Sequence, residues 1–339
     1  MTSTSVSVHP KLSSSDHAEG YWQFFESTSS PGCVARVPCA LTDEFAAFLG
    51  AGRMSSTAVD MATWLKVLLG GGRCSRTGRQ VLAEETIKRC GKGTERFYER
   101  AREHPELSPA VYGHGLSEQA YRGHTIVEHS GFLQGWASRL MFVPEIKLGV
   151  FVIVNSTPWG RMACEEAKYA ILDNVFGLNR IDWHSRLMAE RIELRQMLDS
   201  IYKEALGTSS DGTSIPPSKI VGVYTAPGFV TWSFDEAHIL SGPPAELVDL
   251  LPFPMVWGKI QPLIWHHSGN AYKMCWKFFP DGIGYEEMVG LPLDVEVDVH
   301  EDSVKGFGVR GFWGAGKGVP SPSGDTVQQR SEVYFKKVS

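Results

Sequence analysis

The sequence lacks both long apolar runs and an excess of basic residues. No stretch approaches the roughly 18 uninterrupted apolar residues that a membrane helix needs. The Ser/Thr-rich N-terminus has neither the basic nor the apolar region of a secretory signal. With 33 basic and 38 acidic residues, the net charge of −5 argues against nucleic-acid binding. We therefore expect a cytoplasmic protein without a membrane or nucleic-acid partner.

Patterns that hold metals or cofactors are missing as well. The six cysteines lie far apart without a C-x-x-C pair, which is typical of reduced thiols rather than of disulfides or a zinc site. His266 and His267 are adjacent and would point to opposite faces of a strand, so they make a poor metal pair. No glycine-rich phosphate loop follows a strand. The sequence predicts neither a metal nor a cofactor.

What is present divides the chain into four parts. Residues 1–20 are polar and predict a flexible tail. The stretch 207–218, GTSSDGTSIPPS, is rich in Gly, Ser and Pro and predicts a linker. The lengths of 21–206 and 219–339 are each sufficient for a domain with its own core. We therefore predict two domains joined by that linker.

Apolar periodicity predicts a mixed first domain and an all-β second domain. A helix should begin near Thr57, where Asp60 completes a capping pattern, and end at Gly70. An antiparallel meander and two later helices should follow it, and short strands without helices should follow the linker. The predicted strands are 111–116, 124–130, 137–143 and 149–154 in the first domain, and 219–224, 230–234, 272–278 and 331–336 in the second, with helices at 161–176 and 183–206.

Four separate features occur in an order that resembles a known family. They are MSSTAVDM at 54–61, YGHGL at 112–116, the triplet HSG at 129–131 and a strand pair ending at Asn155. Together they resemble the second half of the serine β-lactamase and penicillin-binding-protein-like family, over about 51–177. VGVY at 221–224, followed by PGF at 227–229, resembles the start of a lipocalin-like C-terminal domain. The resemblance implies an α+β fold, with a truncated β-lactamase-like antiparallel sheet and helices followed by a small lipocalin-like barrel.

The resemblance is incomplete where the family's chemistry begins. Family members use a serine nucleophile in S-x-x-K and a tyrosine in Y-x-N/S. Here S-x-x-K occurs only as Ser200–Lys203, after the HSG triplet and within a predicted helix, and Y-x-N/S is absent. The HSG triplet stands where the family has Lys-Thr-Gly. We therefore expect a retained pocket wall without the family's nucleophile helix.

The HSG strand supplies the sharpest candidate residues. His129 is the predicted acid or base, and Ser130 and Tyr112 are the other catalytic candidates. Alternative interpretations are that His129 is a hydrogen-bonded remnant and that Tyr112 is a core aromatic. Strand parity predicts that Tyr112 and His114 share a face and that Glu128 faces away from His129. The predicted substrate-binding residues are Gly131, His114, Trp136, Trp232 and Trp265, although the tryptophans of the second domain could equally be core.

These features favour a cofactor-free enzyme that uses acid/base chemistry on a small organic molecule. Cyclisation, isomerisation, dehydration or condensation in secondary-metabolite biosynthesis fits by analogy. One alternative is a serine hydrolase or acyltransferase that uses Ser55, Ser130 or Ser200. Another is a non-catalytic binding or regulatory remnant. Because the family's N-terminal strands are missing, the edge at 149–154 should be exposed, and we hypothesise a homodimer that covers it.

Overall fold

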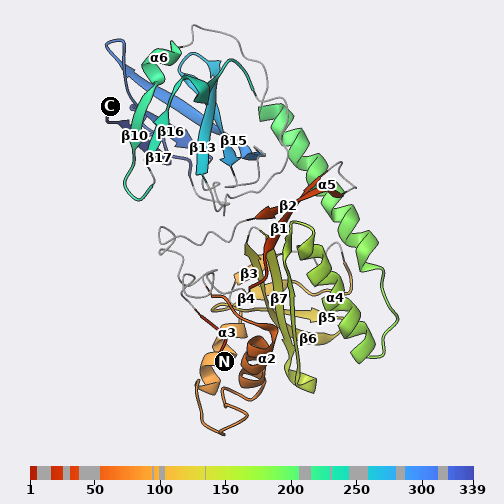
Figure 1. Ribbon diagram of the computed structural model, residues 1–339. Helices are drawn as coiled ribbons and strands as arrows, with labels where there is room; N and C mark the ends of the chain where they lie inside the picture. The colour runs from red at the N-terminus through yellow and green to blue at the C-terminus, as the bar shows by residue number, and fades with distance from the viewer. Residues whose placement is uncertain are drawn as a thin grey trace. The chain divides into compact units, whose positions relative to one another are not determined.

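The computed structural model describes residues 1–5, 17–25, 31–37, 54–93, 95–98, 104–133, 135–205, 215–229, 231–243, 259–279, 287–311 and 320–339. The chain forms two compact units (Figure 1). The first comprises Met1–Gln23 and Cys33–Met188, and the second comprises Phe24–Gly32 and Ala189–Ser339. Residues 207–214 of the predicted linker lie outside the described residues. Among the described helices, none is long and apolar enough to cross a membrane.

The first unit is built on a six-stranded antiparallel sheet in the order β3-β4-β5-β6-β7-β8. Its strands follow one another along the chain, as the predicted meander requires. They are β3 (Glu95–Tyr98), β4 (Ala110–Tyr112), β5 (Ser117–Tyr121), β6 (His124–Leu133), β7 (Trp136–Val143) and β8 (Leu148–Val154). The helices of this unit are α2 (Ala58–Leu69), α3 (Glu84–Gly91) and α4 (Gly160–Val175), with a 3-10 turn η3 (Pro144–Ile146). The helix α5 (Trp183–Ala205) begins in the first unit and ends in the second.

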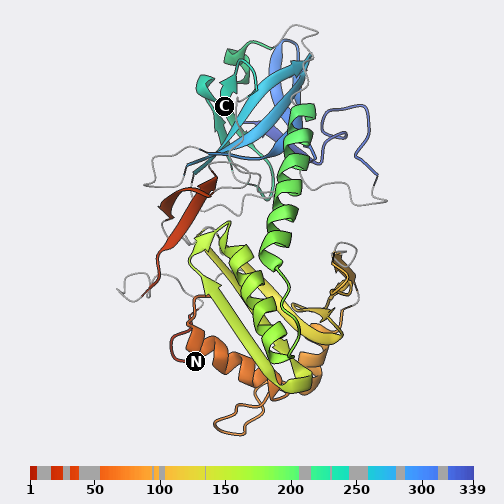
Figure 2. The same cartoon turned by 90° about the vertical axis from the view of Figure 1, so that its right-hand side faces the viewer.

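Helices lie on both sides of the sheet (Figure 2). The side chains of a strand point alternately to its two faces, and they therefore divide the core between these two helical layers. On one face, Val127, Leu140 and Phe142 pack against the apolar stripe of α2. On the other face, side chains from the same strands pack against α4 and the start of α5; the buried residues there include Ile126, Met141, Tyr169, Leu172 and Trp183. Strands β6 and β7 therefore contribute side chains to both cores.

The start of α2 confirms the capping pattern. The Thr57 side chain accepts a hydrogen bond from the Asp60 backbone N–H, and the helix ends at Gly70. The Asp60 carboxylate also accepts hydrogen bonds from Ser3 N at 2.8 Å and from the Thr4 hydroxyl at 2.7 Å. The Thr4 hydrogen bond and other contacts hold the pKa of Asp60 below its usual value. Residues 2–5, which the sequence assigns to a loose tail, are thus tied to a helix.

One predicted strand is wrong. Residues 111–116 do not form a single strand, because β4 ends at Tyr112 and β5 begins at Ser117. Gly115 has a φ of +106°, a backbone conformation that favours glycine, and the chain reverses there. The parity argument that put Tyr112 and His114 on one face therefore fails.

The β8 strand forms one end of the sheet. Its sequence, LGVFVIV, contains no charged residue, and it pairs with β7. Among the described residues no strand pairs with its other edge. Beyond β8, the short strand β9 (Ser156–Thr157) pairs in parallel with β1 (Gly20–Phe25), which also neighbours β2 (Pro31–Val37). The first described strands of the chain, β1 and β2, thus form a separate three-stranded sheet with β9 and do not pair with β8.

The second unit is an eight-stranded, barrel-like sheet in the order β11-β10-β17-β16-β15-β14-β13-β12, with β11 also packing near β13. Residues 219 and 220, predicted to begin the strand 219–224, instead end a short helix that starts at Pro217, a residue that suits a first helical turn; the strand starts at Gly222. The elements are α6 (Pro217–Ile220), β10 (Gly222–Thr225), β11 (Trp232–Phe234), η4 (Glu236–His238), β12 (Ile239–Leu240), β13 (Lys259–Ser268), β14 (Ala271–Phe279), β15 (Glu287–His300), β16 (Ser303–Arg310) and β17 (Val333–Lys337).

Aromatic side chains fill the interior of the second unit. The Trp232 ring stacks on Phe335, with centroids 4.1 Å apart, and meets Trp276 edge-on at 4.9 Å. Tyr224 is fully buried and its hydroxyl donates to the Ile220 carbonyl, while burial raises the pKa of this phenol. The predicted fold class, α+β followed by an all-β barrel, is confirmed.

Four charged side chains meet between β6, β7 and α4: Glu128, Glu165 and Lys168 are buried, and Arg139 is 16% exposed. Lys168 Nζ lies 3.1 Å from Glu128 Oε2 and 2.7 Å from Glu165 Oε2, and the Lys168 side chain is only 2% exposed. Arg139 forms ion pairs with the same two carboxylates. The cluster therefore contains two positive and two negative groups, which compensate one another away from water.

We predict that Lys168→Met destabilises the protein by about 3–5 kcal/mol, because it leaves two buried carboxylates facing one arginine. Urea unfolding followed by circular dichroism would measure the change. Lys203→Met, at an exposed lysine of α5, is the matched control and should leave the unfolding midpoint unchanged. Equal stability of the two variants would show that the cluster is not needed.

Four cysteines among the described residues are free thiols, and they differ in burial: Cys74 and Cys90 are partly exposed, whereas Cys164 and Cys275 are buried. A hydrogen bond with the Thr77 side chain is the main cause that lowers the pKa of Cys74 to about 7. Burial raises the pKa of Cys164, and raises that of Cys275 to about 12. The thiolate, which is the reactive form, is therefore populated at neutral pH at Cys74 and not at the two buried positions.

Iodoacetamide at pH 7 should consequently alkylate Cys74 in the folded protein long before Cys164 or Cys275. Peptide mass spectrometry would follow the three sites over time. Thr77→Val should slow the labelling of Cys74 at this pH, because its pKa rises when the hydroxyl is removed. Labelling at similar rates at all three cysteines would contradict the assignment.

Candidate functional site

The HSG triplet lies in the central strand β6, which pairs with β5 on one side and β7 on the other. Burial ends where the triplet begins, because Ile126, Val127 and Glu128 are buried whereas His129 and Ser130 are exposed. Glu128 belongs to the ion cluster on the α4 side of the sheet. His129 is therefore presented to solvent by a strand whose preceding residue is anchored in the core.

Tyr112 and His129 form the clearest chemical pair of this region. The Tyr112 hydroxyl lies 3.1 Å from His129 Nε2, and the ring centroids are 6.0 Å apart. Either group can donate in this hydrogen bond, depending on the histidine tautomer. The fold thus brings together two residues that are 17 positions apart and that were both predicted to be catalytic. Phenol and imidazole are groups that can give or take a proton.

Gly131 lies directly opposite Ser138 on β7. A Cβ atom at Gly131 would lie 2.3 Å from the Ser138 hydroxyl oxygen, so the glycine makes room for that hydroxyl. Sequence reasoning missed Ser138. The register of the β6–β7 hairpin could have found it, since pairing outward from the turn places residue 138 beside residue 131.

The other hydroxyl candidates lack a basic partner. Ser130 is exposed and pairs across the strands with Arg139, and its hydroxyl forms no hydrogen bond among the described residues. Ser55 forms a β-bridge with Ser5, and its hydroxyl contacts the Ser5 carbonyl. Ser200 lies on the long helix α5. In the described part of the chain, none of these three serines is hydrogen-bonded to a lysine, a histidine or a tyrosine side chain.

The predicted substrate-binding residues are not all gathered around His129. His114 Nδ1 lies 3.3 Å from the Arg89 carbonyl of α3. Trp136 begins β7, opposite Leu133, and its ring packs against Gly20. Trp232 and Trp265 belong to the second unit, where they are 6% and 2% exposed in two different apolar clusters. A ligand-binding role for these four residues stays a prediction.

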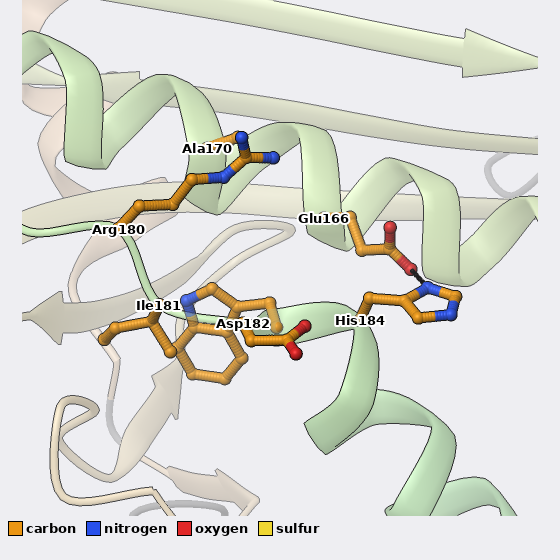
Figure 3. Close-up of a pocket in the computed structure, with 7 residues that line it drawn as sticks. Glu166, Ala170, Arg180, Ile181, Asp182 and His184 are labelled. Atoms are coloured by element: carbon orange, nitrogen blue, oxygen red, sulfur yellow. Dashed lines mark hydrogen bonds and ion pairs between the residues drawn. The ribbon is translucent and has the colours of Figure 1, made fainter.

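A separate cavity of about 340 Å³ lies between α4 and the start of α5 (Figure 3). His184 Nδ1 and Glu166 Oε1 form a hydrogen bond across it at 2.9 Å. Asp182 caps α5 by accepting hydrogen bonds from the Ser185 backbone and hydroxyl, and these hydrogen bonds lower its pKa. The polar groups of this cavity are thus partly engaged in holding the two helices together.

Metal-ligating side chains are not clustered in the described part of the chain. No group of three or more His, Cys, Asp or Glu side chains is arranged there to hold an ion.

Comparisons with known proteins find a family match that covers most of the first unit. Residues 7–174 match the Beta-lactamase family model. The unguisins hydrolase ungD of Aspergillus violaceofuscus is 24% identical over 192 residues, which is 53% of this chain and 34% of that protein. The unguisins hydrolase ungD' of Aspergillus campestris is 25% identical over 126 residues, or 36% of this chain and 23% of that protein. The chain thus spans a third or less of these curated relatives.

Among solved structures, the octameric penicillin-binding protein homologue from Pyrococcus abyssi aligns with 99% of this chain and 57% of its own chain. The sequence identity is 14% and the TM-score is 0.39, which is too low to establish a shared overall fold. The match to the Beta-lactamase family model thus covers residues 7–174, which contain the retained motifs and the six-stranded sheet that carries them.

Proposed function

We propose that the protein is a cofactor-independent enzyme in which His129 and Tyr112 transfer protons to and from a small organic substrate. The observation that carries this proposal is their 3.1 Å contact at the solvent-facing surface of β6. Imidazole changes its charge near neutral pH, so it can act as a base in one step and as an acid in the next. The hydrogen-bonded phenol orients the ring and shares the proton.

The reaction class that suits such a pair is a cyclisation, isomerisation, dehydration or condensation. None of these reactions requires a covalent serine intermediate, and none of the described serines considered above has a basic partner. The setting we propose is secondary-metabolite biosynthesis in the cytoplasm, with a small molecule as the ligand.

Kemp elimination of 5-nitrobenzisoxazole, a general probe of proton abstraction, would test the pair. His129→Gln should lower the rate by roughly 100-fold or more, because the base is lost. Tyr112→Phe should reduce the rate less and alter its pH profile. His184→Gln removes another exposed histidine and is the control. Equal rates in the wild type and His129→Gln would remove His129 from the mechanism.

A second candidate function is hydrolysis or acyl transfer, which the names of the curated relatives favour. It would require Ser55, Ser130 or Ser200 to act as the nucleophile. A fluorophosphonate probe should leave the intact protein unlabelled if the acid/base proposal is right. Stoichiometric labelling that disappears in one serine-to-alanine variant would instead establish the hydrolase. A third, non-catalytic candidate is a binding or regulatory remnant, which turnover by the isolated chain would exclude.

We also propose that two copies of the chain associate through β8. The free edge of this strand carries backbone groups that another strand can pair with, and no charged residue or proline blocks it. An antiparallel pairing of two β8 strands would continue the sheet across a twofold axis. Ile153, which is 49% exposed at this end of the sheet, would then be shielded from water.

Light scattering should accordingly report a dimer for the wild type and a monomer for Ile153→Lys, because two ammonium groups would meet near the axis. Val175→Lys is the matched control, since Val175 is 44% exposed on α4 rather than on the strand. A monomeric wild type, or equal dissociation of both variants, would contradict pairing through β8.

A further inference from the structure

The second unit has a lysine-lined cavity that the proposed chemistry does not use. Its volume is about 510 Å³, and it lies where α6, the turn between β15 and β16, and the end of β17 meet. Four lysines line it: Lys219, Lys305, Lys336 and Lys337. They come from three separate elements, so the fold and not a local run of sequence brings them together.

Two of these lysines are held in place by the protein. Lys219 Nζ lies 2.6 Å from the Asp302 carboxylate. Lys337 is partly buried, and its ammonium donates to the Lys219 carbonyl at 2.8 Å. The same ammonium lies 5.8 Å from the centre of the Tyr224 ring. The cavity wall is therefore an arranged surface, with Lys337 fixed between a carbonyl and an aromatic ring.

The other two lysines carry charge that the described residues do not neutralise. Lys305 and Lys336 are exposed, and neither forms an ion pair in the described part of the chain. Among the side chains that line the cavity, the acidic one is Asp302. Four lysine ammonium groups against this one carboxylate leave an excess of positive charge in a protein whose net charge is −5.

We propose that this cavity binds a compact, multiply charged anion, namely a small molecule that carries two or more phosphate or carboxylate groups. Its oxygen atoms would accept charge-assisted hydrogen bonds from Lys305 and Lys336, and its charge would offset the repulsion among the clustered ammonium groups. Lysine is a common point-charge ligand for phosphate. A long polyanion is disfavoured, because the negative charge of the whole chain would repel it beyond the cavity.

The state of Lys337 supports this assignment. Burial lowers the pKa of its ammonium group, which means that the protein alone compensates this charge incompletely. An anion bound in the cavity would supply the missing compensation. The occupant need not enter the core of the unit, since aromatic side chains already fill the interior.

Isothermal titration of the full chain with inorganic pyrophosphate would test the site. We expect binding by the wild type and an affinity at least tenfold lower in the double variant Lys305→Gln with Lys336→Gln. Both side chains are exposed, so the fold should persist, and circular dichroism would verify it. The control is Lys66→Gln with Lys92→Gln, which removes the same charge from exposed positions of the first unit and should leave the affinity unchanged.

Failure of the wild type to bind millimolar pyrophosphate would overturn the proposal. So would an equal loss of affinity in the site variant and the control, because net charge alone would then explain the binding. Sedimentation with phosphatidic acid vesicles separates a soluble ligand from a lipid headgroup. Vesicle binding by the wild type that is lost in the site variant, without pyrophosphate binding, would reject the soluble anion.

Discussion

The buried ion cluster of Glu128, Arg139, Glu165 and Lys168 is the constraint on which the first unit depends. It joins the central strands β6 and β7 to α4, where an unmatched charge would be costly. Because side chains alternate along a strand, anchoring Glu128 on the α4 side leaves His129 on the exposed side. In β6, Glu128 therefore lies in the ion cluster, and the next residue, His129, is exposed to solvent.

The proposed chemistry uses His129 and Tyr112 and does not need the serine nucleophile that is usual in the β-lactamase family. The β-lactamase family match extends to residue 174, near the end of α4, and it includes the strand that carries His-Ser-Gly. In the described residues that strand faces Tyr112 rather than a Ser–Lys pair. Imidazole and phenol in contact can move protons without a covalent intermediate, which is why acid/base chemistry fits the site better than acylation of a serine.

In the second unit, aromatic side chains fill the interior and lysines line a cavity at the surface. Trp232, Trp276 and Phe335 occupy the space inside the curled sheet, so a ligand has little room there. The lysines at the ends of β16 and β17 surround an open cavity instead. At these strand ends Lys305 and Lys336 are exposed, so that their charged groups remain in water. We therefore propose that this unit binds its ligand at the lysine-lined cavity and not in its apolar interior.

Sequence patterns alone determined the class of each part, the capped helix α2 and the strands from β6 to β8, because hydrophobic periodicity and caps are local properties. They also singled out His129 and Tyr112. Only the tertiary structure decided that these two side chains touch, that Ser138 faces Gly131 and that His114 turns toward α3. Such contacts depend on turn geometry and strand register. A reversal at Gly115 ended one predicted strand early, and lysines distant in sequence converged on one cavity only when the sheet curled.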